Sequence, residues 1–267
     1  MISRVRITSV GHAVFAVTMI GIGLMGLIQG DFAPIWQQIP EGLAGSRWLA
    51  YLCAFVSLGC GLGLLLRRTA APAARVLFVF LFLWMLLVDG RFIVQAPLTE
   101  GSYQMTGETA VIVAAAWVLY AWFATDQDRR RVAFAVGDPG VRLARVLFGL
   151  ALIAFGLSHF TYLELTAPLV PAWLPAHVFW AYFTGATFTA AGVAVITGVW
   201  SRLAAALSAW QIGLFTLIVW VPILAAGNVS AQHWVESVDS WVLTAAAWVV
   251  ADSYRNTPWL AARFGKP

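Results

Sequence analysis

Charged residues are scarce in this sequence: they make up 10% of its 267 residues, whereas a soluble domain has roughly a quarter. Hydrophobic residues account for 61%. This balance excludes an ordinary soluble fold and predicts an integral membrane protein whose first partner is the lipid bilayer. The 16 basic residues are scattered between apolar stretches and form no basic face with interleaved aromatic residues, so no nucleic-acid partner is expected.

Cysteine is almost absent. Cys53 and Cys60 are the only two, and their spacing places them about 10 Å apart along one helix, too far for a disulfide. Without a C-x-x-C pair, a thiol–disulfide relay carried by this chain alone is excluded. Dense metal-binding patterns such as H-E-x-x-H are also missing, and no metal site is predicted.

Long apolar segments are abundant. Most approach the ~20 residues that a helix needs to cross a bilayer, and a spanning segment must be helical because lipid cannot satisfy open backbone groups. We therefore predict an all-α membrane protein with eight transmembrane helices, over Val10–Gln29, Trp48–Leu66, Val76–Val94, Glu108–Ala124, Val146–Phe160, His177–Val199, Leu203–Ala226 and Ala231–Ala251.

The basic residues predict the orientation. With a cytoplasmic N-terminus, only Arg47 and Arg91 fall on the outer side, and the other basic residues fall inside, as the positive-inside rule requires. The expected location is the cell (inner) membrane, with both termini cytoplasmic. The inside residues are Arg4, Arg6, Arg67, Arg68, Arg75, Arg129, Arg130, Arg131, Arg142, Arg145, Arg202, Arg255, Arg263 and Lys266.

The two halves of the chain resemble each other. The pentapeptide Ala-Ala-Ala-Trp-Val at 114–118 recurs at 245–249, and the alignment that superimposes the two copies also pairs Glu108 with Asp239. We call this the repeat alignment. Four spans in each half would make the repeats parallel. The predicted organisation is a first four-helix repeat over 1–125, a basic cytoplasmic linker over 126–145, a second four-helix repeat over 146–254 and a cytoplasmic tail over 255–267.

Four acidic or basic residues fall within the predicted hydrocarbon region or at its edge: Asp89, Arg91, Glu108 and Asp239. Charges at such depth are rare and usually face a cavity or a partner. Asp89 and Arg91, near a predicted helix end, have a second interpretation, in which their side chains reach the headgroups.

Histidine is limited to four residues, and three of them map to the outer boundary of the second half: His159, His177 and His233. Glu164, Glu236 and Asp239 lie near them in the sequence. Imidazole with carboxylate can bind a metal, hydrogen-bond a quinone or relay protons, but polar residues at a membrane boundary are also often simply hydrated. The sequence leaves these alternatives open.

One part of the second half resembles a known family. Gly156-Leu157-Ser158-His159-Phe160, then Pro171-Ala172-Trp173-Leu174-Pro175, then Tyr182, Gly185 and Gly192, is similar to the pattern of the DoxX-like family of small four-helix membrane proteins. The resemblance covers about residues 142–225. Many family members carry a glutamate in a G-x-x-E-x-x-x-G run, and this chain departs from it with Gly185-Ala186-Thr187-Phe188-Thr189-Ala190-Ala191-Gly192.

The resemblance implies two DoxX-like repeats and an accessory or anchor subunit of a quinone-linked redox system, with a redox protein as partner. Quinone is then the possible cofactor, and no catalytic residue is assigned. The expected ligand-binding residues are His159, Tyr162, Glu164, Trp173, His177, His233 and Glu236. Two alternatives remain: a small-molecule or lipid transporter with its pathway between the repeats, lined by Asp89, Arg91 and Glu108, and a passive membrane scaffold.

Overall fold

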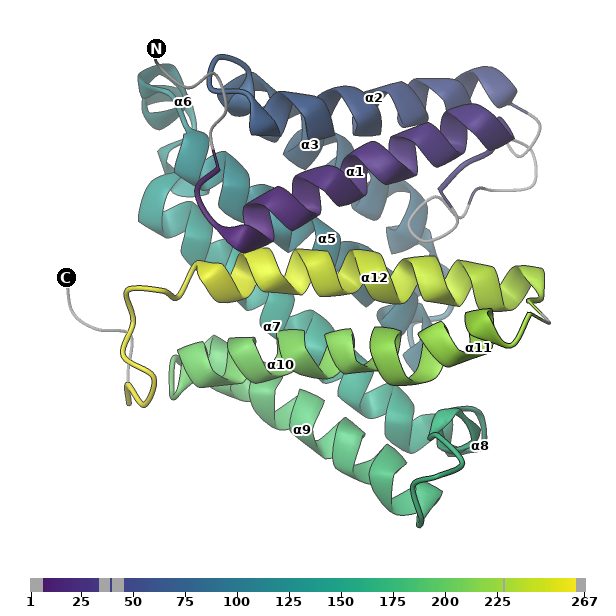
Figure 1. The fold of residues 1–267 in the computed structure, drawn as a ribbon. Helices are drawn as coiled ribbons and strands as arrows, with labels where there is room; N and C mark the ends of the chain where they lie inside the picture. Colours follow the sequence, from purple (N-terminus) through teal and green to yellow (C-terminus); the bar gives the residue numbers. More distant parts are fainter. Residues whose placement is uncertain (1–6, 34–38, 40–45, 228, 263–267) are drawn as a thin grey trace.

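The computed structural model describes residues 7–33, 39, 46–227 and 229–262, and the regular structure of these residues is helical (Figure 1). The predicted cytoplasmic residues Arg4, Arg6, Arg263 and Lys266 lie outside the described residues.

The first half contains four long helical segments. The third is continuous from Ala70 to Gln95, but a π-helical turn at Met85–Asp89 interrupts its α-helical hydrogen bonding and separates α3 from α4. The elements are α1 (Val10–Gln29), α2 (Arg47–Leu65), α3 (Ala70–Trp84), α4 (Gly90–Gln95) and α5 (Glu100–Phe123).

The second half has the same succession after a short connection. That connection holds α6 (Asp126–Arg131) and a 3₁₀ turn (Ala133–Ala135). The following elements are α7 (Gly137–Thr161), α8 (Leu163–Thr166), a 3₁₀ turn (Ala167–Leu169), α9 (His177–Thr197), α10 (Ser201–Phe215), a π-helical turn (Thr216–Trp220), α11 (Val221–Ala225) and α12 (Ala231–Asp252).

Seven helical segments of the described residues are long and apolar enough to cross a membrane, so the chain is an α-helical, multi-pass membrane protein. The eighth predicted span corresponds to α12, which has 22 residues but also carries Glu236, Asp239 and Asp252. Three boundaries differ from the prediction by several residues. The span predicted to begin at Val146 belongs to α7, which begins at Gly137 within the predicted linker. The spans predicted from Val76 and Glu108 begin at Ala70 and Glu100. Polar and small residues extend these helices beyond their apolar runs.

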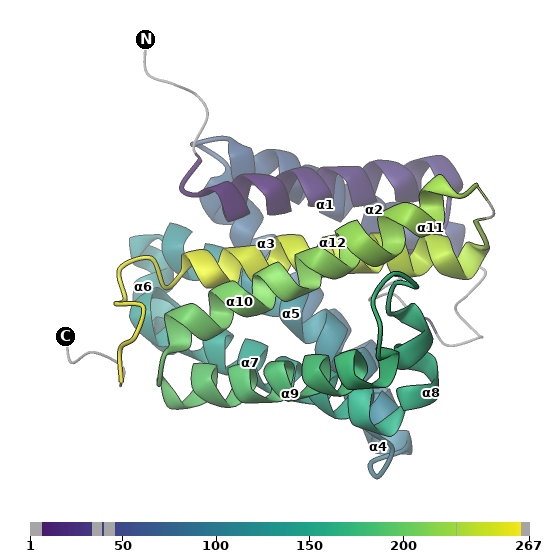
Figure 2. The same ribbon diagram turned by 60° about the horizontal axis from the view of Figure 1, so that its bottom comes forward.

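Helices α5 and α12 lie at the centre of the bundle (Figures 1 and 2). Helix α5 packs against α3, α7 and α12, while α12 packs against α1, α5 and α10. The repeated alanines explain this position, because Ala114–Ala116 and Ala245–Ala247 are fully buried and small side chains let helices approach closely. The two predicted repeats therefore meet along their last helices.

Glycine produces a second close contact, between α7 and α9. A Cβ atom at Gly156 would lie 2.6 Å from the Gly185 carbonyl oxygen, and one at Gly185 would lie 2.9 Å from the Gly156 oxygen. The contrast with Gly59 is informative, because a Cβ there would meet nothing within 4 Å. Gly156 and Gly185 thus allow the backbones of α7 and α9 to pack in direct contact.

The two ends of the bundle differ in charge. Helix α1 begins and α12 ends at the same end in Figure 1, where α3, α7 and α10 also begin and most arginines lie; we call this the basic end. A salt bridge between Arg75 Nη2 and Asp128 Oδ1 (2.7 Å) ties α3 to α6 there. The opposite end, where α5, α9 and α12 begin, carries Glu100, Glu164 and Glu236; we call it the acidic end.

Asp128, which lies outside the predicted spans, accepts several hydrogen bonds. Its Oδ2 atom accepts hydrogen bonds from the Thr125 amide and hydroxyl, and its Oδ1 atom accepts one from Tyr120. Burial alone would raise the pKa of Asp128, but the hydrogen bonds from Thr125 and the hydrogen bond and charge of Arg75 outweigh it and lower the pKa to about 2. The connection between the halves is therefore anchored by an ionised aspartate.

Candidate ligand cavity at the acidic end

A cavity of about 260 Å³ opens at the acidic end, between the first helix pair of the second half and the two central helices. Residues of α5, α7, α9, α10 and α12 line it, together with Thr166, Leu169, Val170, Pro171 and Leu174 from the segment between α7 and α9 that contains α8. Its wall is mostly apolar and rich in aromatic rings: Phe155, Leu169, Val170, Pro171, Leu174, Trp180, Ala181, Phe188, Ile212, Phe215, Ile218, Val219, Trp220 and Leu243. Such a wall suits a small organic molecule.

Three carboxyl groups reach this apolar cavity. Glu108 comes from α5, and Glu236 and Asp239 come from α12, one turn apart. Like charges gathered in an apolar cavity repel one another. None of the lining residues is Lys or Arg, all of them being in the described part of the chain. The cavity therefore favours protons or a cationic group over anions.

Asp239 is the most isolated of these acids. Its side chain is 9% exposed, and its Oδ1 atom is buried without a hydrogen-bond partner among the described residues. By contrast, Glu108 accepts a long hydrogen bond (3.5 Å) from Gln104, and Glu236 accepts one from Gln232. A buried, unpaired carboxyl oxygen is costly, so this atom is suited to receive a ligand or a water molecule.

His159 supplies the only imidazole among the cavity-lining residues. Its Nδ1 atom lies 2.8 Å from the carbonyl oxygen of Phe155, which can only accept, so Nδ1 carries the hydrogen. The ring packs against Phe188 and Phe215, with centroids 5.9 and 6.3 Å away. In the neutral ring this leaves Nε2 as a fixed hydrogen-bond acceptor.

The π-helical turn of the second half shapes the far wall. It carries Thr216, whose hydroxyl lies 2.8 Å from that of Ser240, and both side chains are buried. Ser240 follows Asp239 on α12, so this contact fixes α12 against α10 beside the carboxyl group. π-helical turns often occur at functional sites, and this one positions cavity-lining residues.

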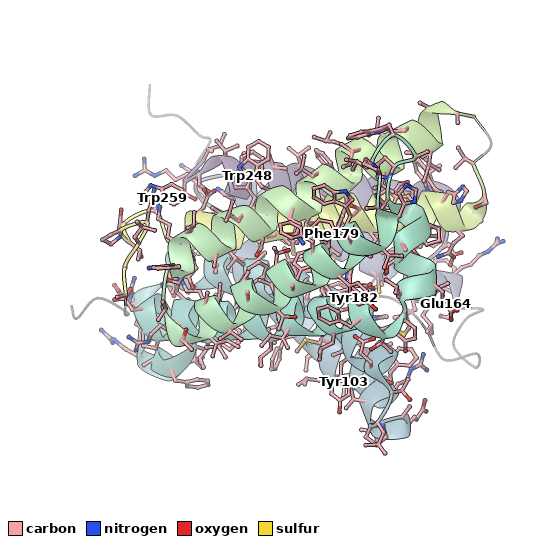
Figure 3. The ribbon with its side chains drawn as sticks, turned by 90° about the horizontal axis from the view of Figure 1, so that it is seen from below. Tyr103, Glu164, Phe179, Tyr182, Trp248 and Trp259 are labelled. Carbon is pink, nitrogen blue, oxygen red and sulfur yellow. The ribbon has the colours of Figure 1, made fainter. Side chains whose placement is uncertain are left out.

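Two of the seven predicted ligand-binding residues, His159 and Glu236, line the cavity. The other five do not line it. The Tyr162 hydroxyl accepts a hydrogen bond from the Gly101 amide, which ties the loop to α5. Glu164 and Trp173 are exposed, and Figure 3 shows Glu164 at the edge of the molecule. His177 begins α9, and His233 lies in the first turn of α12.

The predicted intramembrane polar residues divide in the same way. Glu108 and Asp239 line the cavity, whereas Asp89 and Arg91 do not. Asp89 is 2% exposed on the first π-helical turn, where its backbone oxygen accepts a hydrogen bond from Thr106. The guanidinium group of Arg91 lies 4.6 Å from the Phe92 ring centroid. Asp89 thus belongs to the contact between the first π-helical turn and α5, and Arg91 lies on α4 outside the cavity.

Sequence reasoning missed Gln104, Ser240 and the aromatic residues of α10 and of the π-helical turn after it that complete the cavity. Phe215 and Trp220 lie in an uninterrupted apolar segment, which gives no sign of which side faces a cavity. A usable signal did exist for Phe188, since it occupies the position of the glutamate in the G-x-x-E-x-x-x-G pattern.

Comparison of the chain with models of protein families, with curated proteins and with solved structures found no match.

Proposed function

We propose that this protein is an eight-span membrane protein built from two copies of one four-helix unit, with DoxX-like character. The element bounds support the duplication, because the repeat alignment pairs the first and last residues of α3 with those of α10, and does the same for the π-helical turns that follow them. It also pairs Glu100, where α5 begins, with Ala231, where α12 begins. Because α12 is central and packed on three neighbours, its acids can be tolerated inside a span.

The orientation belongs to the same proposal. The basic end faces the cytoplasm and the acidic end faces outward, as the positive-inside rule requires for a cell (inner) membrane protein. The cavity then opens toward the outer side.

The proposed function is to bind a quinol or quinone near the outer face, as an accessory or anchor subunit of a membrane redox system. The observation that supports this function is that one aromatic cavity contains both a fixed hydrogen-bond acceptor, His159 Nε2, and carboxyl groups. A quinol hydroxyl would donate to Nε2, and its ring would pack against Phe188 and Phe215. Oxidation of a quinol releases two electrons and two protons; a partner redox protein would take the electrons, and the cavity acids would accept protons.

The departure from the DoxX-like pattern fits this proposal. The family's acid position is occupied by Phe188, whose ring lies beside His159. The acids of this cavity come instead from the central helices, as Glu108, Glu236 and Asp239. The chain therefore keeps an acidic cavity while using different residues.

A second candidate function is transport of a small cationic molecule between the repeats. Two observations favour it: the cavity takes residues from both halves, and its lining holds three carboxyl groups and no Lys or Arg within the described chain. Alternating access at a repeat interface is a common design of transporters.

Mass spectrometry of organic extracts distinguishes the two candidates. The protein would be purified in mild detergent as wild type, His159→Ala and His177→Ala, the last being a matched histidine outside the cavity. A near-stoichiometric quinone in wild type and His177→Ala, lost in His159→Ala, supports quinone binding. An absence of quinone in wild type contradicts it, and uptake of an organic cation by proteoliposomes would then support transport.

A further inference from the structure

A second cavity, of about 460 Å³, lies toward the basic end between α10 and α12. It is separate from the acidic cavity in its lining and its chemistry. Its wall is mostly apolar, and four exposed tryptophans, Trp210, Trp241, Trp248 and Trp259, border it. Figure 3 shows Trp248 and Trp259 at the end of the molecule away from Glu164.

Small residues create this cavity. Ala209 and Gly213 on α10 and Ala251 on α12 line it. The residues that the repeat alignment pairs with them in the first half are all aromatic: Phe78, Phe82 and Tyr120. There, the Phe78 ring packs on those of Tyr120 and Phe82, each 5.5 Å away, and fills the space between α3 and α5. The second half thus has an open groove where the first half has a packed aromatic cluster.

Two arginines stand at the basic end of the groove. Arg202 donates to the Thr257 carbonyl oxygen (2.8 Å) and lies 4.1 Å from the Trp259 ring centroid. Arg255 donates to the Thr8 carbonyl oxygen (2.9 Å). Neither forms a salt bridge within the described residues, and a guanidinium has five N–H donors, so each keeps donors for a further acceptor.

Asp252 is the one acidic residue in the lining of this groove, as far as the described chain extends. Its Oδ2 atom accepts a hydrogen bond from the Gly11 amide (2.9 Å), which directs the carboxylate toward the start of α1. The mouth of the groove therefore carries two arginines and one aspartate, and the aspartate is already hydrogen-bonded to the Gly11 amide. Its net charge is positive. The mouth therefore complements an anion.

We propose that this groove binds an anionic phospholipid of the leaflet at the basic end. Its phosphate would lie between Arg202 and Arg255, and one acyl chain would lie along α10 and α12 beside the tryptophans. A cation at the boundary above an apolar slot matches the two chemical parts of a phospholipid. The tryptophans also favour this depth, because their amphipathic rings sit at membrane interfaces.

Native mass spectrometry tests this site. The full chain would be released from detergent with equimolar phosphatidylglycerol and phosphatidylcholine of identical acyl chains. Wild type should retain phosphatidylglycerol preferentially. Arg202→Gln and Arg255→Gln should each reduce that preference roughly fivefold, the value of one lost lipid–arginine contact. Arg142→Gln, an exposed arginine at the same end but outside the groove, should leave it unchanged.

A second variant tests the apolar part of the groove separately from its charged mouth. Gly213→Phe introduces the aromatic residue that the repeat alignment pairs with Gly213, Phe82, and should reduce retention of both lipids. Circular dichroism would check that the helix content is unchanged. Equal retention of the two lipids by wild type would overturn the proposal. So would an Arg202→Gln variant with wild-type selectivity, or a dimer whose dissociation accompanies lipid binding, since the groove would then be an interface between copies.

Discussion

Glu108 on α5 and Asp239 on α12 are paired by the repeat alignment and line the same cavity, on the two central helices that pack against each other. Two carboxylates in an apolar cavity repel each other unless a proton or a cation neutralises them. The pair therefore links the proposed duplication to the proposed function: two acids that the repeat alignment pairs line one cavity.

The first prediction concerns the cost of this arrangement. Asp239→Asn removes a buried charge whose Oδ1 atom has no partner among the described residues, so it should stabilise the protein in detergent by about 1 kcal/mol while weakening ligand binding. Thermal unfolding of the purified protein measures the first effect. Glu164→Gln, an exposed acid at the same end, should change stability by less than about 0.5 kcal/mol. A destabilised Asp239→Asn would mean that the carboxylate has a structural partner.

The second prediction is a pH dependence at the basic end. Because the pKa of Asp128 in the folded protein is about 2, below its unfolded value, its stabilising contribution is complete above about pH 5 and is lost as the pH falls toward 2. Hydrogen exchange of α6 amides should therefore accelerate between pH 5 and pH 3, after correction for the intrinsic rate. In Asp128→Asn the exchange should already be fast at pH 6 and should no longer respond to acid in this range.

The third prediction tests the α7–α9 contact. Gly156→Ala places a Cβ atom 2.6 Å from the Gly185 carbonyl oxygen, so the helices must separate, at a cost of about 1–3 kcal/mol in unfolding free energy. Since His159 lies one turn away on α7, ligand binding should weaken as well. Gly59→Ala is the matched control, because its Cβ would meet nothing within 4 Å. Equal stability of the two variants would contradict the packing described above.

Much of the fold could be predicted from the sequence, because a lipid environment forces apolar runs of sufficient length into helices. The repeat alignment pairs the bounds of α3 with those of α10, but the spans predicted there began at Val76 and Leu203, which the alignment does not pair. The π-helical turns could not be predicted, because Met85–Asp89 and Thr216–Trp220 have no common sequence signal. The extra turns of α7 before Val146 were missed because they are polar.

The candidate site was harder to predict than the fold. His159 and Glu236 were recognised as polar groups near one membrane boundary, but so were His177 and His233, and the sequence does not show which of these residues line a cavity. From the sequence, Glu108 was placed with Asp89 and Arg91 in a transport pathway and not with the ligand-binding residues. Its proximity to Asp239 was not foreseen, because it arises from the packing of α5 on α12. Such long-range contacts leave no mark in a single sequence.

The most direct test of the central claim is a binding titration with a short-chain quinol and its quinone, using the protein in lipid nanodiscs. His159 Nε2 is an acceptor, so the quinol should bind more tightly than the quinone. His159→Ala should weaken quinol binding roughly tenfold, the effect of one lost hydrogen bond with its ring contact, while His177→Ala should bind as wild type does. Equal quinol affinities for wild type and His159→Ala would contradict the assignment of this cavity as a quinol site.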